Sequence, residues 1–253
     1  MKTRLQILNV WVDTYNKEDC IGKVRAFLIS GNRPYGIFAV NPEKNFMASK
    51  DPVLSETLKN ADLLIPDGIG IVLAARILYG IRLERVPGVE FMEVICALAA
   101  KEGYRTFVYG GKDAVNSAAV QILKGRYSGL EISGRSHGYV REKEMPDLIK
   151  RINDSKADIL FLALGSPIQE KWFATYNHLL KSVKICQGIG GTLDTIAGNV
   201  KRAPELWRKC GVEWLYRLLA EPTRIKRQKV LPIFALMVLM CKFKNLLKGS
   251  QKF

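Results

Sequence analysis

Closely spaced cysteines and histidines are missing from this sequence. The cysteines are odd in number and widely scattered: Cys20, Cys96, Cys186, Cys210 and Cys241. No two of them form a Cys-x-x-Cys pair, and the two histidines, His137 and His178, lie too far apart for a metal-ligand spacing. The pattern argues against a disulfide framework and against a zinc knuckle. We therefore expect no metal site, and we expect the cysteines to be buried hydrophobic residues in a reducing cytoplasm.

Long uninterrupted apolar runs are also missing. Residues 1–16 contain Asp13 and lack the apolar segment and cleavage site of a signal peptide, so we expect a strand to start there. No apolar stretch reaches the roughly 18 residues that predict a membrane-spanning helix. A shorter run of 12 residues, Val230 to Cys241, lies between Lys229 and Lys242. It suits either a helix lying in a membrane interface, with lysines near lipid phosphates, or a buried core helix.

Acidic residues are scarce toward the C-terminus. Residues 201–253 hold 13 Lys or Arg and 3 Glu, a local net charge of +10, and the first 200 residues supply only +5 of the total +15. A basic segment attached to a nearly balanced body predicts an anionic partner: membrane lipid, pyrophosphate or nucleic acid. No interleaving of aromatic and basic residues appears in the body, which argues against nucleic acid.

Short apolar runs alternate with longer amphipathic segments over the first 200 residues. Strands separated by single helices predict an α/β fold, a Rossmann-like and mostly parallel sheet with helices on both faces. The expected strands are 8–12, 36–40, 62–66, 106–110, 130–134, 157–165 and 183–190. After about residue 200 the strand pattern stops. We expect a core over residues 1–200 and a basic, α-helical, membrane-associating appendage over 201–253, with helices broken at Pro204, Pro222 and Pro232.

Several expected strands end in polar or glycine-rich loops. Ligands of open α/β sheets bind beyond the carboxyl ends of the strands, so these loops are candidate site segments. They are 41–44 (Asn-Pro-Glu-Lys), 66–68 (Pro-Asp-Gly), 110–112 (Gly-Gly-Lys), 165–167 (Gly-Ser-Pro) and 188–191 (Gly-Ile-Gly-Gly). Taken alone, Pro-Asp-Gly is a common turn sequence, and each glycine loop could be no more than a tight turn. Their convergence on one edge is what favours a site.

Single residues in these loops allow more than one interpretation. The stretch from Gly188 resembles a dinucleotide-binding loop, but Leu193 occupies the position of the third glycine, so the NAD fingerprint fails. The loop could still offer backbone amides to a nucleotide phosphate. Glu170 is expected in the first turn of a helix, where capping would explain it. Its neighbour Gln169 could bind sugar hydroxyls, and Arg85 alone would be a solvated surface residue.

Nine motifs together give the chain a recognisable order. They are NPEK (41–44), IPDGIG (65–70), ERVPGVE (84–90), YGGK (109–112), HGY (137–139), ALGSPIQEKW (163–172), GIGGTLDTIAG (188–198), KRAP (201–204) and EWLYRLLAEPTRIKR (213–227). In this order, over about residues 8–228, the chain resembles the WecG/TagA/CpsF glycosyltransferase family.

The resemblance implies an inverting, metal-independent transfer of a sugar from a UDP-sugar to a polyprenyl-diphosphate-linked sugar, without a cofactor. The acceptor is commonly undecaprenyl-diphosphate carrying N-acetylglucosamine. The products serve teichoic acid, capsule or exopolysaccharide synthesis in the cell envelope. The enzyme would be peripheral on the cytoplasmic face of the bacterial membrane, with homo-oligomerisation left open and no nucleic acid partner. N-acetylmannosamine, its uronic acid and glucose all remain candidate sugars.

The resemblance also implies roles for individual residues. Asp67 matches the family's proposed general base, and Arg85 and Gln169 match other catalytic residues. Asn41 and Gly70 would lie on the acceptor side. Residues of the UDP pocket would be Gly110, Gly111, Lys112, Tyr139, Gly165, Gln169, Gly190 and Asp194. Tail arginines that would fold over the site and meet pyrophosphate are Arg217, Arg224 and Arg227.

This sequence departs from the family pattern at two acceptor-side positions. The family often has Thr two residues before the asparagine, where this chain has Ala39. Some members have Ser three residues after the aspartate, where this chain has Gly70. Both departures predict that contacts to the acceptor differ here. Two alternatives from other classes remain, an NAD(P) oxidoreductase and a basic nucleic-acid-binding protein.

Overall fold

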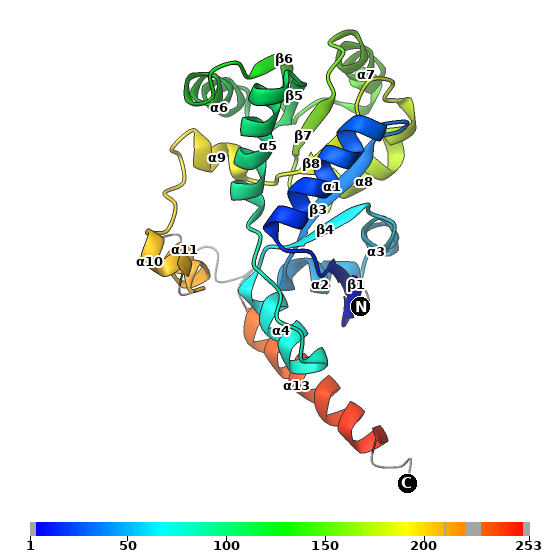
Figure 1. Cartoon of the computed structure of the whole chain (residues 1–253), viewed down its shortest axis with the longest axis vertical. Coiled ribbons are helices and arrows are strands. Elements are labelled where there is room, and N and C mark those ends of the chain that lie inside the picture. The colour runs from blue at the N-terminus through cyan, green and yellow to red at the C-terminus, as the bar shows by residue number, and fades with distance from the viewer. Residues whose placement is uncertain (1–3, 210, 221–228, 250–253) are drawn as a thin grey trace.

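The protein is built around a six-stranded parallel sheet. The computed structural model describes residues 4–209, 211–220 and 229–249 (Figure 1). The strand order is β4-β3-β8-β7-β5-β6. The strands are β3 (Tyr35–Val40), β4 (Leu63–Pro66), β5 (Arg105–Gly110), β6 (Glu131–Ser136), β7 (Ile159–Ala163) and β8 (Ile185–Gly188). All six were predicted from the sequence, and each neighbouring pair is parallel.

Helices cover both faces of this sheet, as expected for strands that are apolar along their whole length. All five residues of β7 are buried, for example. One face packs against α1 (Lys17–Ser30), α5 (Gly88–Glu102), α6 (Asp113–Arg126) and α9 (Thr192–Ile196). The other face packs against α2 (Pro42–Ala48), α3 (Pro52–Lys59), α4 (Ile69–Tyr79), α7 (Met145–Asp154) and α8 (Ile168–Tyr176). The α/β prediction with a doubly covered sheet is confirmed.

The predicted first strand, 8–12, is wrong in its placement. The chain instead forms a two-stranded antiparallel hairpin of β1 (Arg4–Ile7) and β2 (Val10–Asp13). Leu8 has a φ of 52°, in the left-handed region that residues other than glycine seldom adopt, and it forms the turn with Asn9. Asn9 is a common turn residue, but Leu8 is not, and no glycine or proline accompanies them, so the apolar run was taken as one strand.

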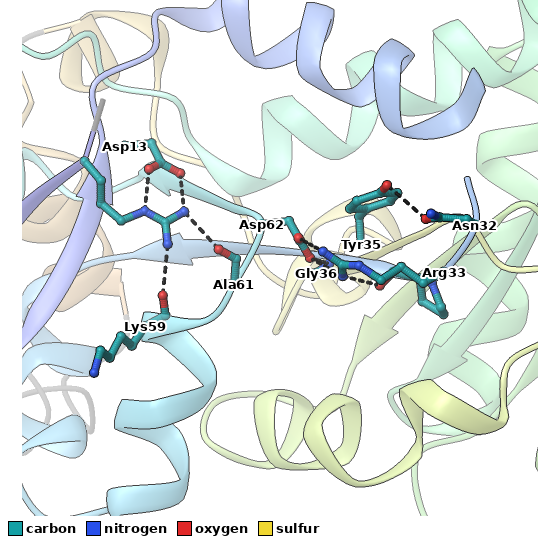
Figure 2. Close-up of polar contacts among 10 residues, drawn as sticks. Asp13, Asn32, Arg33, Tyr35, Gly36, Lys59, Ala61 and Asp62 are labelled. Atoms are coloured by element: carbon teal, nitrogen blue, oxygen red, sulfur yellow. Dashed lines mark hydrogen bonds and ion pairs between the residues drawn. The ribbon is translucent and has the colours of Figure 1, made fainter. Parts of the chain in front are cut away.

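The hairpin is fixed beside the edge strand β4 by the Asp13 carboxylate. Its Oδ2 accepts a hydrogen bond of 2.8 Å from the Leu64 N–H. Arg4 donates to both carboxylate oxygens, at 2.6 and 2.9 Å, and its guanidinium also reaches the Lys59 and Ala61 carbonyls (Figure 2). Asp13 is buried, so the hairpin both covers the sheet edge and satisfies a backbone donor there.

A second arginine–aspartate pair lies just before the start of the same strand. Asp62 accepts from the Gly36 N–H at 2.8 Å and from Arg33, whose Nη1 lies 3.1 Å from Asp62 Oδ2. Figure 2 shows both pairs flanking the start of β4, with Tyr35 and Asn32 beside Arg33. Together the two carboxylates hold the start of β4 in place.

The described parts of the C-terminal segment are mainly helical, as predicted. Its elements are α10 (Glu205–Lys209), α11 (Glu213–Ala220) and α13 (Val230–Gly249). Pro204 directly precedes α10, whereas Pro222 lies outside the described residues. Pro232 does not break a helix: it lies in the first turn of α13, where its missing N–H is tolerated.

The last helix differs from the sequence expectation in length. The run from Val230 to Leu247 is long and apolar enough to cross a membrane by length and composition, because the helix continues past Lys242. Figure 1 shows α13 lying along α4, and α13 also contacts α2. Phe234 and Val238 are buried in this contact. One side of α13 is thus packed on the core, and much of the rest is exposed.

Most of the described cysteines are buried. Cys20, Cys96 and Cys186 are buried free thiols, which confirms the expectation for them. Burial raises the pKa of the Cys20 and Cys96 thiols to about 12, so both are protonated at neutral pH. Cys241 on α13 is half-buried, and Cys210 lies outside the described residues.

The Asp13 network gives a stability test. We expect Asp13→Ala to lower the free energy of unfolding by about 3 kcal/mol, because it leaves the Arg4 guanidinium and the Leu64 N–H without their acceptor. Urea denaturation followed by circular dichroism measures it. Asp154→Ala is the control, since Asp154 forms an exposed helical pair with Lys150, and we expect no measurable change. Equal stability of the two variants would contradict this account of the hairpin.

Candidate active site

The candidate site is the edge of the sheet where the six parallel strands end. Asn41 follows β3, Asp67 follows β4, His137 follows β6, and Gly110 ends β5. The glycine loops at 165 and 190 follow β7 and β8. The predicted convergence of these loops therefore follows from the parallel sheet itself.

Asp67 lies at the end of β4, next to the start of α5. Its Oδ1 accepts a hydrogen bond of 3.1 Å from the Gly88 N–H, the first residue of that helix. Its own N–H donates to the Val40 carbonyl at 3.1 Å, and Val86 N–H donates to the Pro66 carbonyl at 2.8 Å. The partial positive charge of the helix N-terminus favours a carboxylate at this position. The Pro-Asp-Gly segment is thus a turn that presents an acid at the rim.

The acceptor-side residues predicted from the resemblance lie next to Asp67. Asn41 caps α2: its Oδ1 accepts from the Lys44 N–H at 2.9 Å. A Cβ at Gly68 would lie 3.2 Å from the Asn41 Cβ, so the loops after β3 and β4 touch. A Cβ at Gly70 would lie only 2.7 Å from Pro42 Cγ. Close packing of α4 on α2 therefore gives Gly70 a reason to lack a side chain.

Arg85 joins the rim to the appendage. It lies in the loop between α4 and α5, and its Nη2 is 2.9 Å from Oε2 of Glu213 on α11. Both side chains are mostly buried. Arg202 forms a second ion pair, with Glu90 on α5. Two ion pairs thus connect the residues after 200 to α5, which begins beside Asp67, and to the loop that precedes it.

The predicted tail arginines are only partly described. Arg217 lies on α11, the helix whose Glu213 pairs with Arg85. Arg224 and Arg227 lie outside the described residues.

The loops predicted for the UDP pocket are bonded to one another. Gly111 N–H donates to the Ala163 carbonyl at 3.0 Å, and Gly138 N–H donates to the Gly111 carbonyl at 2.8 Å. Gly110 has a φ of 129°, and a Cβ there would lie 2.3 Å from the Ala163 oxygen, so only glycine fits. The loops after β5, β6 and β7 therefore form one unit.

The remaining predicted pocket residues surround this unit. Lys112 and Tyr139 are exposed, and 69% of Tyr139 is accessible. Gly165 and Gly190 both have positive φ angles, 76° and 53°. Asp194 is half-buried on α9, which packs beside α6.

Gln169 is buried, and its amide bonds within the protein. Its Oε1 accepts from the Gly190 N–H at 2.9 Å, and its Nε2 donates to Glu170 Oε1 at 3.0 Å. Only 2% of Gln169 is accessible, so in this structure it holds the glycine loop after β8 in place.

Glu170 and Lys44 form a buried pair that sequence reasoning missed. Glu170 lies in the first turn of α8, as expected, but it makes no capping bond there. Instead it is fully buried, and its Oε1 lies 2.6 Å from Lys44 Nζ. No local pattern marks this pair because its members come from motifs far apart in the chain.

The described residues contain no group of three or more His, Cys, Asp or Glu side chains that could hold a metal ion. Groups at the rim that could stabilise negative charge are the glycine-loop N–H groups, helix N-termini and Arg85.

The chain is similar to bacterial enzymes of sugar transfer. The profile of the Glycosyl transferase WecG/TagA/CpsF family matches residues 5–248. A relative from Bacillus subtilis (strain 168) is 38% identical over 204 residues, which is 80% of this chain and 78% of that protein. It is named N-acetylglucosaminyldiphosphoundecaprenol N-acetyl-beta-D-mannosaminyltransferase. A protein of the same name from Staphylococcus aureus (strain MRSA252) is 33% identical over 91% of this chain and 90% of its own length.

A solved structure gives no comparable support. A 5,10-methylenetetrahydrofolate dehydrogenase from the silkworm, Bombyx mori, covers 72% of this chain and 91% of its own, with 16% identity. Its TM-score of 0.25 is too low to carry an argument for a dehydrogenase.

The family profile covers nearly the whole chain, and the relatives match from the core into the appendage. The chain belongs to the WecG/TagA/CpsF family of glycosyltransferases.

Proposed function

We propose that this glycosyltransferase moves an N-acetylmannosamine-type sugar from a UDP-sugar to N-acetylglucosamine on undecaprenyl diphosphate, with Asp67 as the general base. The observation that carries the proposal is the place of Asp67, whose carboxylate is held by Gly88 N–H at the rim beside Asn41. The names of the relatives support the sugar and the acceptor, since they describe such a transfer in those proteins.

The chemistry proposed for Asp67 is a single displacement. Asp67 takes the proton from an acceptor hydroxyl as that oxygen bonds to the anomeric carbon of the donor. The bond between this carbon and the UDP oxygen breaks, and its electron pair leaves with UDP. Such a displacement inverts the anomeric centre, so an α-linked donor would give the β linkage in the relatives' names. General-base assistance contributes about 10²–10⁴-fold to such a step.

The departing UDP gains negative charge, which the rim must stabilise. The N–H groups of Gly111 and Gly190 bond within the protein. We therefore propose that other backbone N–H groups of these two loops and the guanidinium of Arg85 stabilise this charge. No Asp-x-Asp motif, the usual metal-binding signature of nucleotide-sugar enzymes, follows the rim strands in the sequence. We therefore propose a metal-independent reaction, in which Arg217, Arg224 and Arg227 of the appendage add positive charge.

The appendage is proposed to bring the enzyme to the cytoplasmic face of the membrane. α13 exposes a set of large apolar side chains: Ile233, Leu236, Leu239, Met240, Phe243, Leu246 and Leu247. Lys242 and Lys244 interrupt this set and suit lipid phosphates. Because α13 packs along α4, whose N-terminus adjoins Asp67, a lipid-bound acceptor held there would lie near the proposed base.

Ligand binding separates this proposal from its alternatives. We expect UDP to raise the midpoint of thermal unfolding, and NAD or a short oligonucleotide to leave it unchanged, because the glycine loops lack the dinucleotide spacing. Differential scanning fluorimetry with the three ligands measures this. Stabilisation by NAD but not by UDP would favour the oxidoreductase, and stabilisation by the oligonucleotide alone would favour nucleic acid binding.

The role of Asp67 is tested by Asp67→Asn. We expect UDP binding to stay within about threefold of wild type and the transfer rate to fall by about 10²–10⁴-fold, because the amide cannot accept the proton. Calorimetry with UDP and a radiolabelled transfer assay measure the two quantities. Asp154→Asn is the matched control, since Asp154 is exposed at the last residue of α7, which leads to the start of β7 at the opposite edge of the sheet. Wild-type turnover by Asp67→Asn would rule out Asp67 as the base.

The role of α13 is tested more cleanly by substitution than by deleting residues 201–253. Deletion is expected to abolish transfer and membrane binding, but it also removes Phe234 and Val238 from the core. Leu239→Ser with Phe243→Ser changes only exposed positions, so we expect thermal stability to hold and sedimentation with anionic vesicles to fall at least about tenfold. Ile29→Ser, on an exposed position of α1, is the control. Unchanged vesicle binding by the double variant would contradict the proposal.

A further inference from the structure

The two sides of the rim are joined by a buried ion pair. Lys44 belongs to α2, which Asn41 caps on the acceptor side. Glu170 belongs to α8, which follows β7 on the other side. Their side chains are 6% and 0% accessible, and Lys44 Nζ lies 2.6 Å from Glu170 Oε1. A charged contact that is this short and this buried fixes the separation of the two helices.

Hydrogen bonds continue from this pair to both loops of the rim. On one side, the Lys44 N–H donates to Asn41 Oδ1 at 2.9 Å. On the other, Gln169 Nε2 donates to Glu170 Oε1, and Gln169 Oε1 accepts from the Gly190 N–H. The connection from Asn41 to Gly190 thus runs through one carboxylate oxygen that receives two donors.

Packing leaves this connection little freedom. A Cβ on Gly188 would lie 2.7 Å from Gln169 Nε2, so the glutamine lies directly against the end of β8. The Lys44 ammonium lies 5.8 Å from the centre of the Phe38 ring, which makes a T-shaped contact with the Phe173 ring of α8. Among the described residues, Glu170 Oε2 has no hydrogen-bond partner, so Oε1 makes the contacts that hold this buried charge.

Stability alone does not account for such a pair. Removing two charges from water costs about as much as their attraction returns, and apolar replacements of buried pairs are often neutral or stabilising. The distinguishing effect of the pair is therefore the fixed separation that it imposes on α2 and α8. In a displacement, the acceptor oxygen and the anomeric carbon must meet in line, and a misplacement of about 1 Å can lower the rate by about 10²-fold.

We propose that Lys44 and Glu170 are positioning residues, which hold the Asn41 side of the rim at a fixed distance from the Gly190 loop and so align acceptor with donor. The proposal rests on the function proposed above, which gives each loop its substrate. It assigns the pair no contact with either substrate. Its signature is a loss in kcat with little change in the binding of UDP.

The decisive variant replaces both charges at once. Lys44→Met with Glu170→Met keeps side-chain length and leaves no unpaired charge, so we expect its unfolding midpoint to stay within about 5 °C of wild type. Glu170→Gln is a second variant, which keeps the shape and weakens the charged contact. Lys171→Met is the matched control: Lys171 is the next residue of α8 and pairs with Asp51 at the start of α3, outside the rim.

Steady-state transfer kinetics give the first readout. We expect both pair variants to lose at least about tenfold in kcat, while KM for the donor and the Kd of UDP change less than about threefold. The control is expected to keep wild-type kinetics. A kcat within about twofold of wild type in the folded double variant would overturn the proposal. If the double variant does not fold, the same limit applies to Glu170→Gln.

Amide hydrogen exchange gives a readout that does not depend on catalysis. The Gly190 N–H donates to Gln169, which Glu170 orients. We therefore expect the peptide containing residues 188–191 to exchange faster in the double variant than in wild type and in Lys171→Met. Unchanged exchange would show that the pair does not hold this loop, and would overturn the proposal whether or not the wild type transfers sugar. Faster exchange in a chain that transfers no sugar would instead count against the proposed function.

Discussion

The parallel direction of six strands is the constraint on which the rest of the structure depends. It places the carboxyl ends of all six strands at one edge, so loops that are distant in the sequence become neighbours there. Backbone hydrogen bonds then fix these loops to one another: Asp67 to Val40, Gly111 to Ala163, and Ile189 to Leu162. Asp67 is presented at the rim because β4 ends there and α5 begins beside it, not because of any feature of Pro-Asp-Gly alone.

The proposed function divides this rim into two sides, and the appendage lies on one of them. α13 packs along α4 and α2, the helices that begin next to Asp67 and Asn41. The ring of Phe234 comes within 3.7 Å of a Cβ placed on Gly70, so the start of α13 lies close to the proposed base. An acceptor carried by lipid would approach from this side. The nucleotide would bind on the other side, at the glycine loops that follow β5, β7 and β8. Lys44 and Glu170 connect the two sides.

Sequence periodicity predicted the sheet because strands buried on both faces are apolar along their length, as β7 is. It failed at Leu8, where a left-handed turn without glycine was marked only by Asn9. The span of α13 was underestimated because Lys242 and Lys244 interrupt an apolar run without interrupting a helix. Ordered motifs identified the site residues but not their contacts. Gln169 bonds to Gly190 and Glu170 to Lys44, and a contact between distant segments has no local sequence pattern.

The most direct test of the account is the product itself. The purified protein would be incubated with a panel of UDP-sugars and undecaprenyl-diphosphate-linked N-acetylglucosamine, and the lipid product would be analysed by mass spectrometry and its anomeric configuration by NMR. The account predicts addition of one N-acetylmannosamine-type residue in β linkage, without added metal ions. No addition from any UDP-sugar, or a product that keeps the configuration of the donor, would contradict it.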